Sequence, residues 1–163
     1  MLALEEEIGT SIEITGIYWH RGSMGSSSGE FGDFQINMGY CAGDSLVTSF
    51  DENWLPGTRV QVFQREAVLL EVLPEDWFGF RLDSSFVYEG SGDLLLEVRW
   101  DGGNGSIQTY LCNPGDTPLC LKASTSDSPS GYPTATRCQF MLEGVLMLQP
   151  ATFGSIKVML GKR

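Results

Sequence analysis

Carboxylates are the side chains of this sequence that come nearest to a catalytic pattern. Glu71 and Glu97 lie in expected strands, and a glycosidase needs two carboxylates that face each other across a cleft. Nothing in their spacing separates them from any outward-facing glutamate of a strand. The single histidine, His20, is expected near a loop, solvated or hydrogen-bonded, and no phosphate-binding G-x-x-x-x-G-K motif is present. We therefore expect a protein that is not an enzyme, with a hydrolase on a jelly-roll scaffold as the weakest alternative.

Two acidic turns carry the oxygen ligands that Ca²⁺ prefers. One turn spans 101–105 and offers Asp101 and Asn104, and the other spans 51–53 and begins with Asp51. These oxygens are candidates for a structural calcium ion, although a polar turn that binds no metal is the plainer interpretation. Zinc is not expected, because the cysteines form no C-x-x-C pair and the chain has one histidine.

The four cysteines bear on the compartment of the protein. Cys112 and Cys120 flank an Asn-Pro-Gly-Asp sequence, a strong turn signal that would bring the two sulfur atoms together. We expect a disulfide between these two, and a second disulfide between Cys41 and Cys138 is the weaker expectation. Four cysteines allow three pairings, and four free thiols packed as small apolar side chains are the alternative.

Carbohydrate binding would need flat aromatic side chains at the surface, with amides or carboxylates nearby for the sugar hydroxyls. Trp54 and Tyr132 lie in predicted loops and are the candidates for such a platform. Packing beneath their own loops is the plainer interpretation of both residues. Trp19 and Trp100 lie in expected strands, where a place in the core is the plainer interpretation.

Composition narrows the class of protein. The chain has 163 residues, enough for one domain with a substantial core. It contains 21 acidic and 10 basic residues, a formal net charge of −11, so we expect no binding to a nucleic-acid backbone. A hydrophobic content of 42% and 20 glycines argue against disordered and long helical proteins. No apolar run reaches the roughly 20 residues of a membrane span, and the first residues do not resemble a secretory signal.

Alternating apolar residues predict strands along most of the chain. The clearest strand is 33–41, and the side chains that share its apolar face are Phe34, Ile36, Met38 and Tyr40. Gly16 stands where the alternation changes phase, which predicts a bulge. The other predicted strands are 11–20, 45–50, 59–64, 68–73, 77–82, 94–100 with its hairpin partner 106–112, 119–123, 136–142 and 155–160. Roughly ten strands without a helical period predict an all-β fold, a two-sheet antiparallel β-sandwich or jelly roll.

Three phrases of the sequence resemble a β-sandwich domain of large secreted or surface-attached bacterial proteins. The segment 86–100, FVYEGSGDLLLEVRW, is similar to the phrase F-x-Y-x-G-x-x-N-L-L-x-E-x-R/W of that domain. The other two are 7–17 (EIGTSIEITGI) and 32–39 (GDFQINMG), so the resemblance covers most of 7–105. Asp93 departs from the pattern, which has Asn there. These phrases encode turns and core positions, and they imply a fold and an extracellular setting without a catalytic signature.

The resemblance also implies one more strand before the segment that matches residues 2–9. We expect a single β-sandwich domain over 1–163, and if that strand is missing, one sheet has an open edge that can accept a strand from a neighbouring subunit. The expected function is a non-enzymatic extracellular or cell-surface structural or interaction module, such as a subunit of a surface layer, appendage or filament. It would assemble through sheet edges with copies of itself or with other surface proteins. The alternative is a carbohydrate-binding module with structural calcium.

Overall fold

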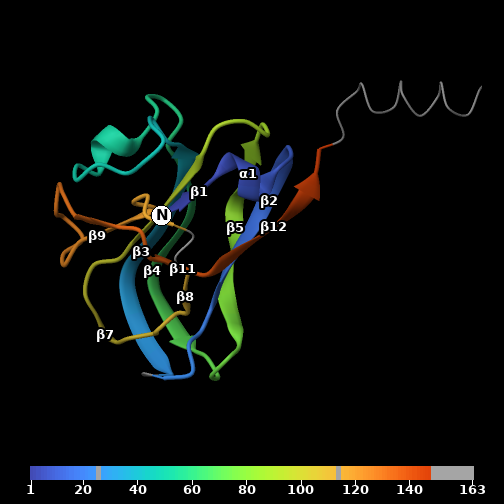
Figure 1. Ribbon diagram of the computed structural model, residues 1–163. Coiled ribbons are helices and arrows are strands. Elements are labelled where there is room, and N and C mark those ends of the chain that lie inside the picture. Colours follow the sequence, from blue (N-terminus) through green and yellow to red (C-terminus); the bar gives the residue numbers. More distant parts are fainter. Residues whose placement is uncertain (25–26, 113–114, 148–163) are drawn as a thin grey trace, which may run out of the picture.

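Two antiparallel β-sheets dominate the computed structural model, which describes residues 1–24, 27–112 and 115–147 (Figure 1). In the larger sheet the strand order is β1 (Leu2–Ala3), β6 (Leu94–Arg99), β3 (Ser28–Tyr40) and β4 (Val60–Glu71), and β7 (Gly103–Gly105) also pairs with β3. In the smaller sheet the order is β12 (Phe140–Leu146), β2 (Ile12–His20) and β5 (Trp77–Tyr88). These sheets confirm the all-β, sandwich-like fold that the sequence predicts.

The remaining elements are short. Two pairs of strands lie outside the main sheets, β8 (Leu111–Cys112) with β11 (Arg137–Cys138), and β9 (Cys120–Lys122) with β10 (Tyr132–Thr134). A single helical turn, α1 (Glu5–Ile8), follows β1, and a 3-10 turn, η1 (Asp51–Asn53), lies in the loop between β3 and β4. Among the described residues, no helix has the length and apolar character that a membrane crossing would need.

The bulge predicted at Gly16 is present. The register of β2 against β5 shifts between Ile14 and Gly16, and β12 shifts between Glu143 and Gly144 on the other side of β2. The apolar phase of β2 changes there, so that Ile14, Ile17 and Trp19 all reach the core.

Pairing differs from the expected hairpin of 94–100 with 106–112. After β6 the chain turns and places β7 beside β3, where a Cβ on Gly103 would lie 2.2 Å from the carbonyl oxygen of Glu30. Gly103 also has φ +125°, a conformation that L side chains rarely adopt, so glycine is what permits this close approach. Of the predicted partner strand only β8 forms, and it pairs with β11.

Two other places in the chain differ from the strand predictions. The segment 45–50 lies in the loop between β3 and β4 and forms no strand. The predicted strands 59–64 and 68–73 are one continuous strand, β4. The predicted strand 155–160 lies outside the described residues.

The main core lies between the two sheets. The alternation of β3 predicts it well, because Phe34, Ile36 and Met38 are all buried. The other sheet contributes Trp19, which is 5% exposed as expected for a core residue. Trp100 is 46% exposed, so its expected place in the core is wrong. The chain leaves β6 at Arg99, and Trp100 stands just past the end of that strand.

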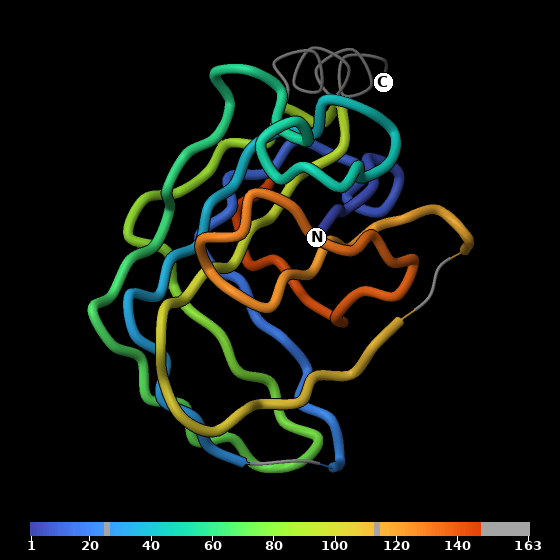
Figure 2. Tube along the Cα trace, turned by 90° about the vertical axis from the view of Figure 1, so that its left-hand side faces the viewer, coloured from blue at the N-terminus to red at the C-terminus, as the bar shows by residue number. Residues whose placement is uncertain are grey.

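A second, smaller core lies on the opposite face of β1 and β6. Leu2 and Leu95 are register partners, and together with Leu46, Trp54 and Leu119 they form one buried cluster. The loop between β3 and β4 and the β9–β10 pair lie side by side over this face (Figure 2). Backbone hydrogen bonds from Leu46 to Pro118 and from Phe50 to Pro129 join the two segments.

Candidate functional site

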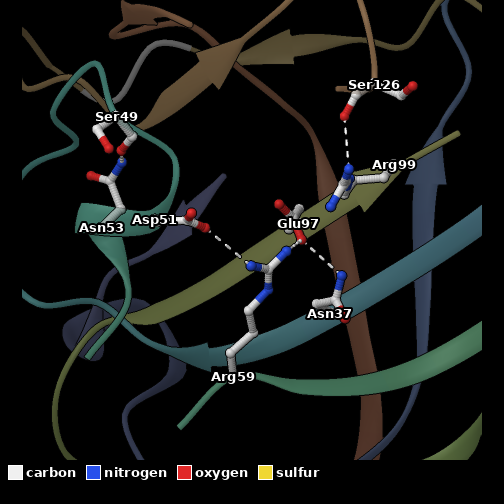
Figure 3. A network of polar contacts seen from close by, with 8 residues as sticks. All are labelled: Asn37, Ser49, Asp51, Asn53, Arg59, Glu97, Arg99 and Ser126. Atoms are coloured by element: carbon white, nitrogen blue, oxygen red, sulfur yellow. Dashed lines mark hydrogen bonds and ion pairs between the residues drawn. The ribbon is translucent and has the colours of Figure 1, made fainter. Parts of the chain in front are cut away.

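A network of polar side chains lies on the same face of the larger sheet as this second core (Figure 3). Glu97 of β6 lies opposite Asn37 of β3, and its carboxylate accepts a hydrogen bond from Asn37 Nδ2 at 2.7 Å. The same carboxylate accepts a second one from Arg59 at 2.5 Å, while Arg59 reaches Asp51 at 3.3 Å. The Arg59 guanidinium lies 5.0 Å from the ring centroid of Trp54. The network therefore ties the loop between β3 and β4 to β6.

Two further contacts hold the loops beside this network (Figure 3). The buried Asn53 side chain accepts a hydrogen bond from the Val47 amide at 2.8 Å and donates to the carbonyls of Val47 and Ser49. Arg99 donates to the carbonyl of Ser126 at 2.8 Å. Both loops over this face are thus anchored by side-chain to backbone hydrogen bonds.

Glu71 and Glu97 do not form a catalytic pair. Glu71 pairs in register with Ser28 and Glu97 with Asn37, nine residues further along β3. At about 3.4 Å per residue the two positions are roughly 30 Å apart, whereas the paired carboxylates of a glycosidase are about 5–10 Å apart. The Glu97 side chain is also only 13% exposed, and its carboxylate is held by two donors.

Trp54 and Tyr132, the two candidates for an aromatic platform, differ in their exposure. Trp54 is 8% exposed and packs in the second core beneath Arg59. The indole ring of Trp54 therefore packs beneath its own loop, which is the plainer of the two interpretations of this residue. Tyr132 is 78% exposed on β10, which leaves its ring available at the surface.

The three expected calcium ligands lie on separate elements. Asp51 begins η1 and its carboxylate is paired with Arg59. Asp101 follows β6, and Asn104 lies in β7 opposite Glu30. No group of three His, Cys, Asp or Glu side chains in the described ranges is arranged to hold a metal ion. Calcium binding therefore stays a prediction from the sequence.

All four cysteines are free thiols in the structure, so neither expected disulfide is formed. Cys112 and Cys120 belong to different strand pairs, with Arg137 opposite Cys112 and Thr134 opposite Cys120. Burial raises the pKa of the Cys120 thiol, and it also raises the pKa of the Cys41 thiol. These two thiols are therefore less ionised at neutral pH than exposed ones.

His20 belongs to an aromatic cluster that the sequence did not indicate. Its ring stacks on Trp77 at 4.8 Å and lies 4.7 Å from the ring of Tyr110. His20 Nε2 lies within hydrogen-bond distance of the carbonyl oxygen of Glu75, at 3.0 Å. The Tyr110 hydroxyl donates to the Glu75 carboxylate at 2.6 Å, and this hydrogen bond raises the pKa of Tyr110. The histidine is thus hydrogen-bonded near a loop, as expected.

The outer edge of β12 is exposed and apolar. This strand stands at the end of the smaller sheet and pairs only with β2 in the described part of the chain. Four apolar side chains in or just after it are largely exposed, at 43–63% of their surface: Met141, Val145, Leu146 and Met147. An edge strand with these properties offers unpaired backbone groups beside an apolar surface.

The edge of β4 is closed by a charged side chain. The carboxylate of Asp83 in β5 accepts a hydrogen bond from the backbone N–H of Gln64 at 3.1 Å. The same carboxylate pairs with the Arg65 guanidinium at 2.7 and 2.8 Å, and this hydrogen bond lowers the pKa of Asp83. A charged side chain bound to an edge N–H blocks the pairing of another strand there.

Comparison of the chain with protein-family models, with curated proteins and with solved structures finds no match. The proposed function therefore rests on the geometry of the protein surface.

Proposed function

We propose that this protein is a non-enzymatic structural or interaction module of an extracellular or cell-surface assembly, in which a strand of a neighbouring subunit adds to β12. The observation that carries the proposal is the apolar edge of β12 at the end of the smaller sheet. Strand addition joins backbone N–H and C=O groups across the new edge, and exposed apolar side chains add burial to these bonds.

The contrast with the two ends of the larger sheet supports this choice of edge. Asp83 and Arg65 close the edge of β4 with charge. At the other end of that sheet, β1 pairs with β6, and the backbone N–H of Leu2 donates a hydrogen bond to the carbonyl of Leu119 at 2.8 Å. Among the described residues, no strand pairs with the outer edge of β12, and no charged side chain is bonded to its backbone there.

Charge also favours this edge for contact between copies of the chain. Two copies each carry a formal net charge of −11 and repel each other at long range. Glu143 is the one acidic residue of β12, which has no basic residue, and its carboxylate lies 3.9 Å from Arg81 and accepts a 2.6 Å hydrogen bond from Tyr18. A second copy, paired by a two-fold axis, therefore meets little repulsion along this strand.

A lysine at Leu146 tests the proposal. Leu146 is 62% exposed in β12 and lies opposite Ile12. We expect the wild-type chain to form oligomers at micromolar concentration. Leu146→Lys would bring a charge into the added sheet, and we expect it to abolish this assembly. Sedimentation velocity and negative-stain microscopy measure this loss, and circular dichroism confirms that the variant stays folded.

Leu69→Lys is the matched control. Leu69 is 70% exposed in β4, whose edge is already closed by Asp83, so we expect it to assemble as the wild type does. A wild-type chain that stays monomeric at every concentration would contradict the proposal. Loss of assembly in Leu69→Lys alone would move the contact from β12 to β4.

A further inference from the structure

An open hollow of about 330 Å³ lies where β6 ends. Its walls come from three parts of the chain: the middle of β3, the end of β6 with the two residues that follow it, and the loop residues Ser126 and Asp127. The hydrogen bond from Arg99 to the Ser126 carbonyl joins the sheet wall to the loop wall at 2.8 Å. Its size is at the lower end of the range of about 300–1,000 Å³ for small-molecule sites.

Trp100 supplies an apolar surface to this hollow. Its side chain is 46% exposed, although tryptophan is a residue that folding normally buries to a large extent. Phe31 supports the indole edge to face, with ring centroids 5.7 Å apart. An indole held by a second ring is a rigid platform, and it loses little conformational entropy when a flat ligand stacks on it.

Hydrogen-bonding groups surround the indole. Asp33, Asp101 and Asp127 offer carboxylate acceptors, and Gln35 offers both a carbonyl oxygen and an amide donor. Arg99 adds a guanidinium whose direction is set by its bond to the Ser126 carbonyl. Sugar hydroxyls both donate and accept, so a wall with both kinds of group satisfies them.

We propose that this hollow binds a neutral saccharide, with a sugar ring stacked on Trp100 and its hydroxyls bound by Asp33, Gln35 and Asp101. The charge of the site sets the ligand class. Three carboxylates stand against one guanidinium in a chain of net charge −11, so a uronic acid or a phosphorylated sugar is repelled. The proposal does not depend on assembly through β12.

The test is titration of the full chain with soluble neutral oligosaccharides of glucose, mannose, galactose and N-acetylglucosamine, followed by tryptophan fluorescence and saturation-transfer NMR. We expect at least one of these probes to bind saturably, and Trp100→Ala to weaken that binding by about tenfold or more. Gln35→Ala should weaken the same binding, because it removes an amide from the wall.

Trp77→Ala is the matched control, since Trp77 is 39% exposed but belongs to the His20 cluster. The Trp77→Ala variant should bind the saccharide with the same affinity as the wild type. Failure of every neutral probe at about 10 mM would overturn the proposal, and so would equal affinity of wild type and Trp100→Ala. Equal binding of oligogalacturonate would overturn the assignment to neutral sugars. Leu146→Lys should bind the saccharide as the wild type does, because its substitution lies in β12 and outside the hollow. The saccharide proposal and the assembly proposal can therefore fail independently.

Discussion

At the scale of single residues, one buried guanidinium joins segments from both ends of the described chain. Arg137 of β11 is 7% exposed, and it donates to the carbonyl of Leu2 in β1 and to the carboxylate of Glu7 in α1. It also lies 5.5 Å from the ring centroid of Phe140. Because a charge in this setting is stable only with its partners, the contact fixes where β11 lies against β1 and α1.

The carboxyl of Glu7 makes this contact sensitive to pH. Burial by itself raises the pKa of Glu7, but hydrogen bonds from the Arg137 guanidinium and the Leu4 amide outweigh it and lower the pKa below its ordinary value. A lowered folded-state pKa contributes stability above the unfolded-state pKa, about 4.5, and that stability is lost as the pH falls through the folded-state pKa.

Glu7→Gln is therefore expected to lower the free energy of unfolding at pH 7 by about 1 kcal/mol, since the Glu7 side chain is partly exposed. The difference from the wild type should shrink as the pH falls below about 4. Urea unfolding at pH 7, 5, 4 and 3 measures it. Glu6→Gln, at an exposed neighbouring position, is the control. A difference that stays constant over this range would contradict the role assigned to Glu7.

At the scale of elements, the contact between β2 and β5 depends on a glycine. Gly79 lies opposite Tyr18, and a Cβ there would lie 2.0 Å from the carbonyl oxygen of Ile17. This neighbour is backbone of the central strand of the smaller sheet, which cannot turn aside as a flexible side chain can. The close approach also brings β5 near enough for Phe80 to reach the ring of Trp19, at 6.3 Å.

Gly79→Ala is expected to lower the free energy of unfolding by about 1–3 kcal/mol, because the added methyl group must push the two strands apart. Gly43→Ala is the matched control, since a Cβ on Gly43 meets no atom within 4 Å, and its effect should stay within about 0.5 kcal/mol. Urea unfolding followed by tryptophan fluorescence measures both variants. Equal stability of the two would show that β2 and β5 can relax around the methyl group.

At the scale of the whole molecule, net charge opposes the proposed assembly. The net charge of −11 makes two copies repel each other over a distance of about one Debye length. The apolar edge of β12 attracts another copy only when the two surfaces touch. Screening should therefore weaken the repulsion between copies and leave the contact itself intact.

We expect assembly of the wild type to strengthen when the ionic strength rises from about 0.01 M to about 0.15 M, because the Debye length falls from about 30 Å to about 8 Å. Light scattering against concentration at both salt levels measures this change. Leu146→Lys should remain monomeric in both. Weaker assembly at the higher salt would indicate that opposite charges hold the subunits together.

Hydrophobic alternation along the sequence predicted much of the fold, because it depends only on residues within one strand. Alternation placed Phe34, Ile36 and Met38 in the core, and a phase change located the bulge at Gly16. Both features depend on the two-residue period of a strand and on residues adjacent in the chain.

Contacts between segments far apart in the chain decided which strands pair and which side chains are covered. The sequence by itself determined an acidic, all-β chain. It left open whether Trp54 packs beneath its loop or is exposed, and it placed Trp100 in the core, which is wrong. Trp54 is buried because the β3–β4 loop and the β9–β10 pair cover Leu95 together. Trp100 is exposed because β7, and not the predicted hairpin strand, continues beside β3 after β6 ends. Which strands pair, and what covers a sheet face, depends on residues far apart in the chain, so only the tertiary structure decided where the candidate surfaces lie.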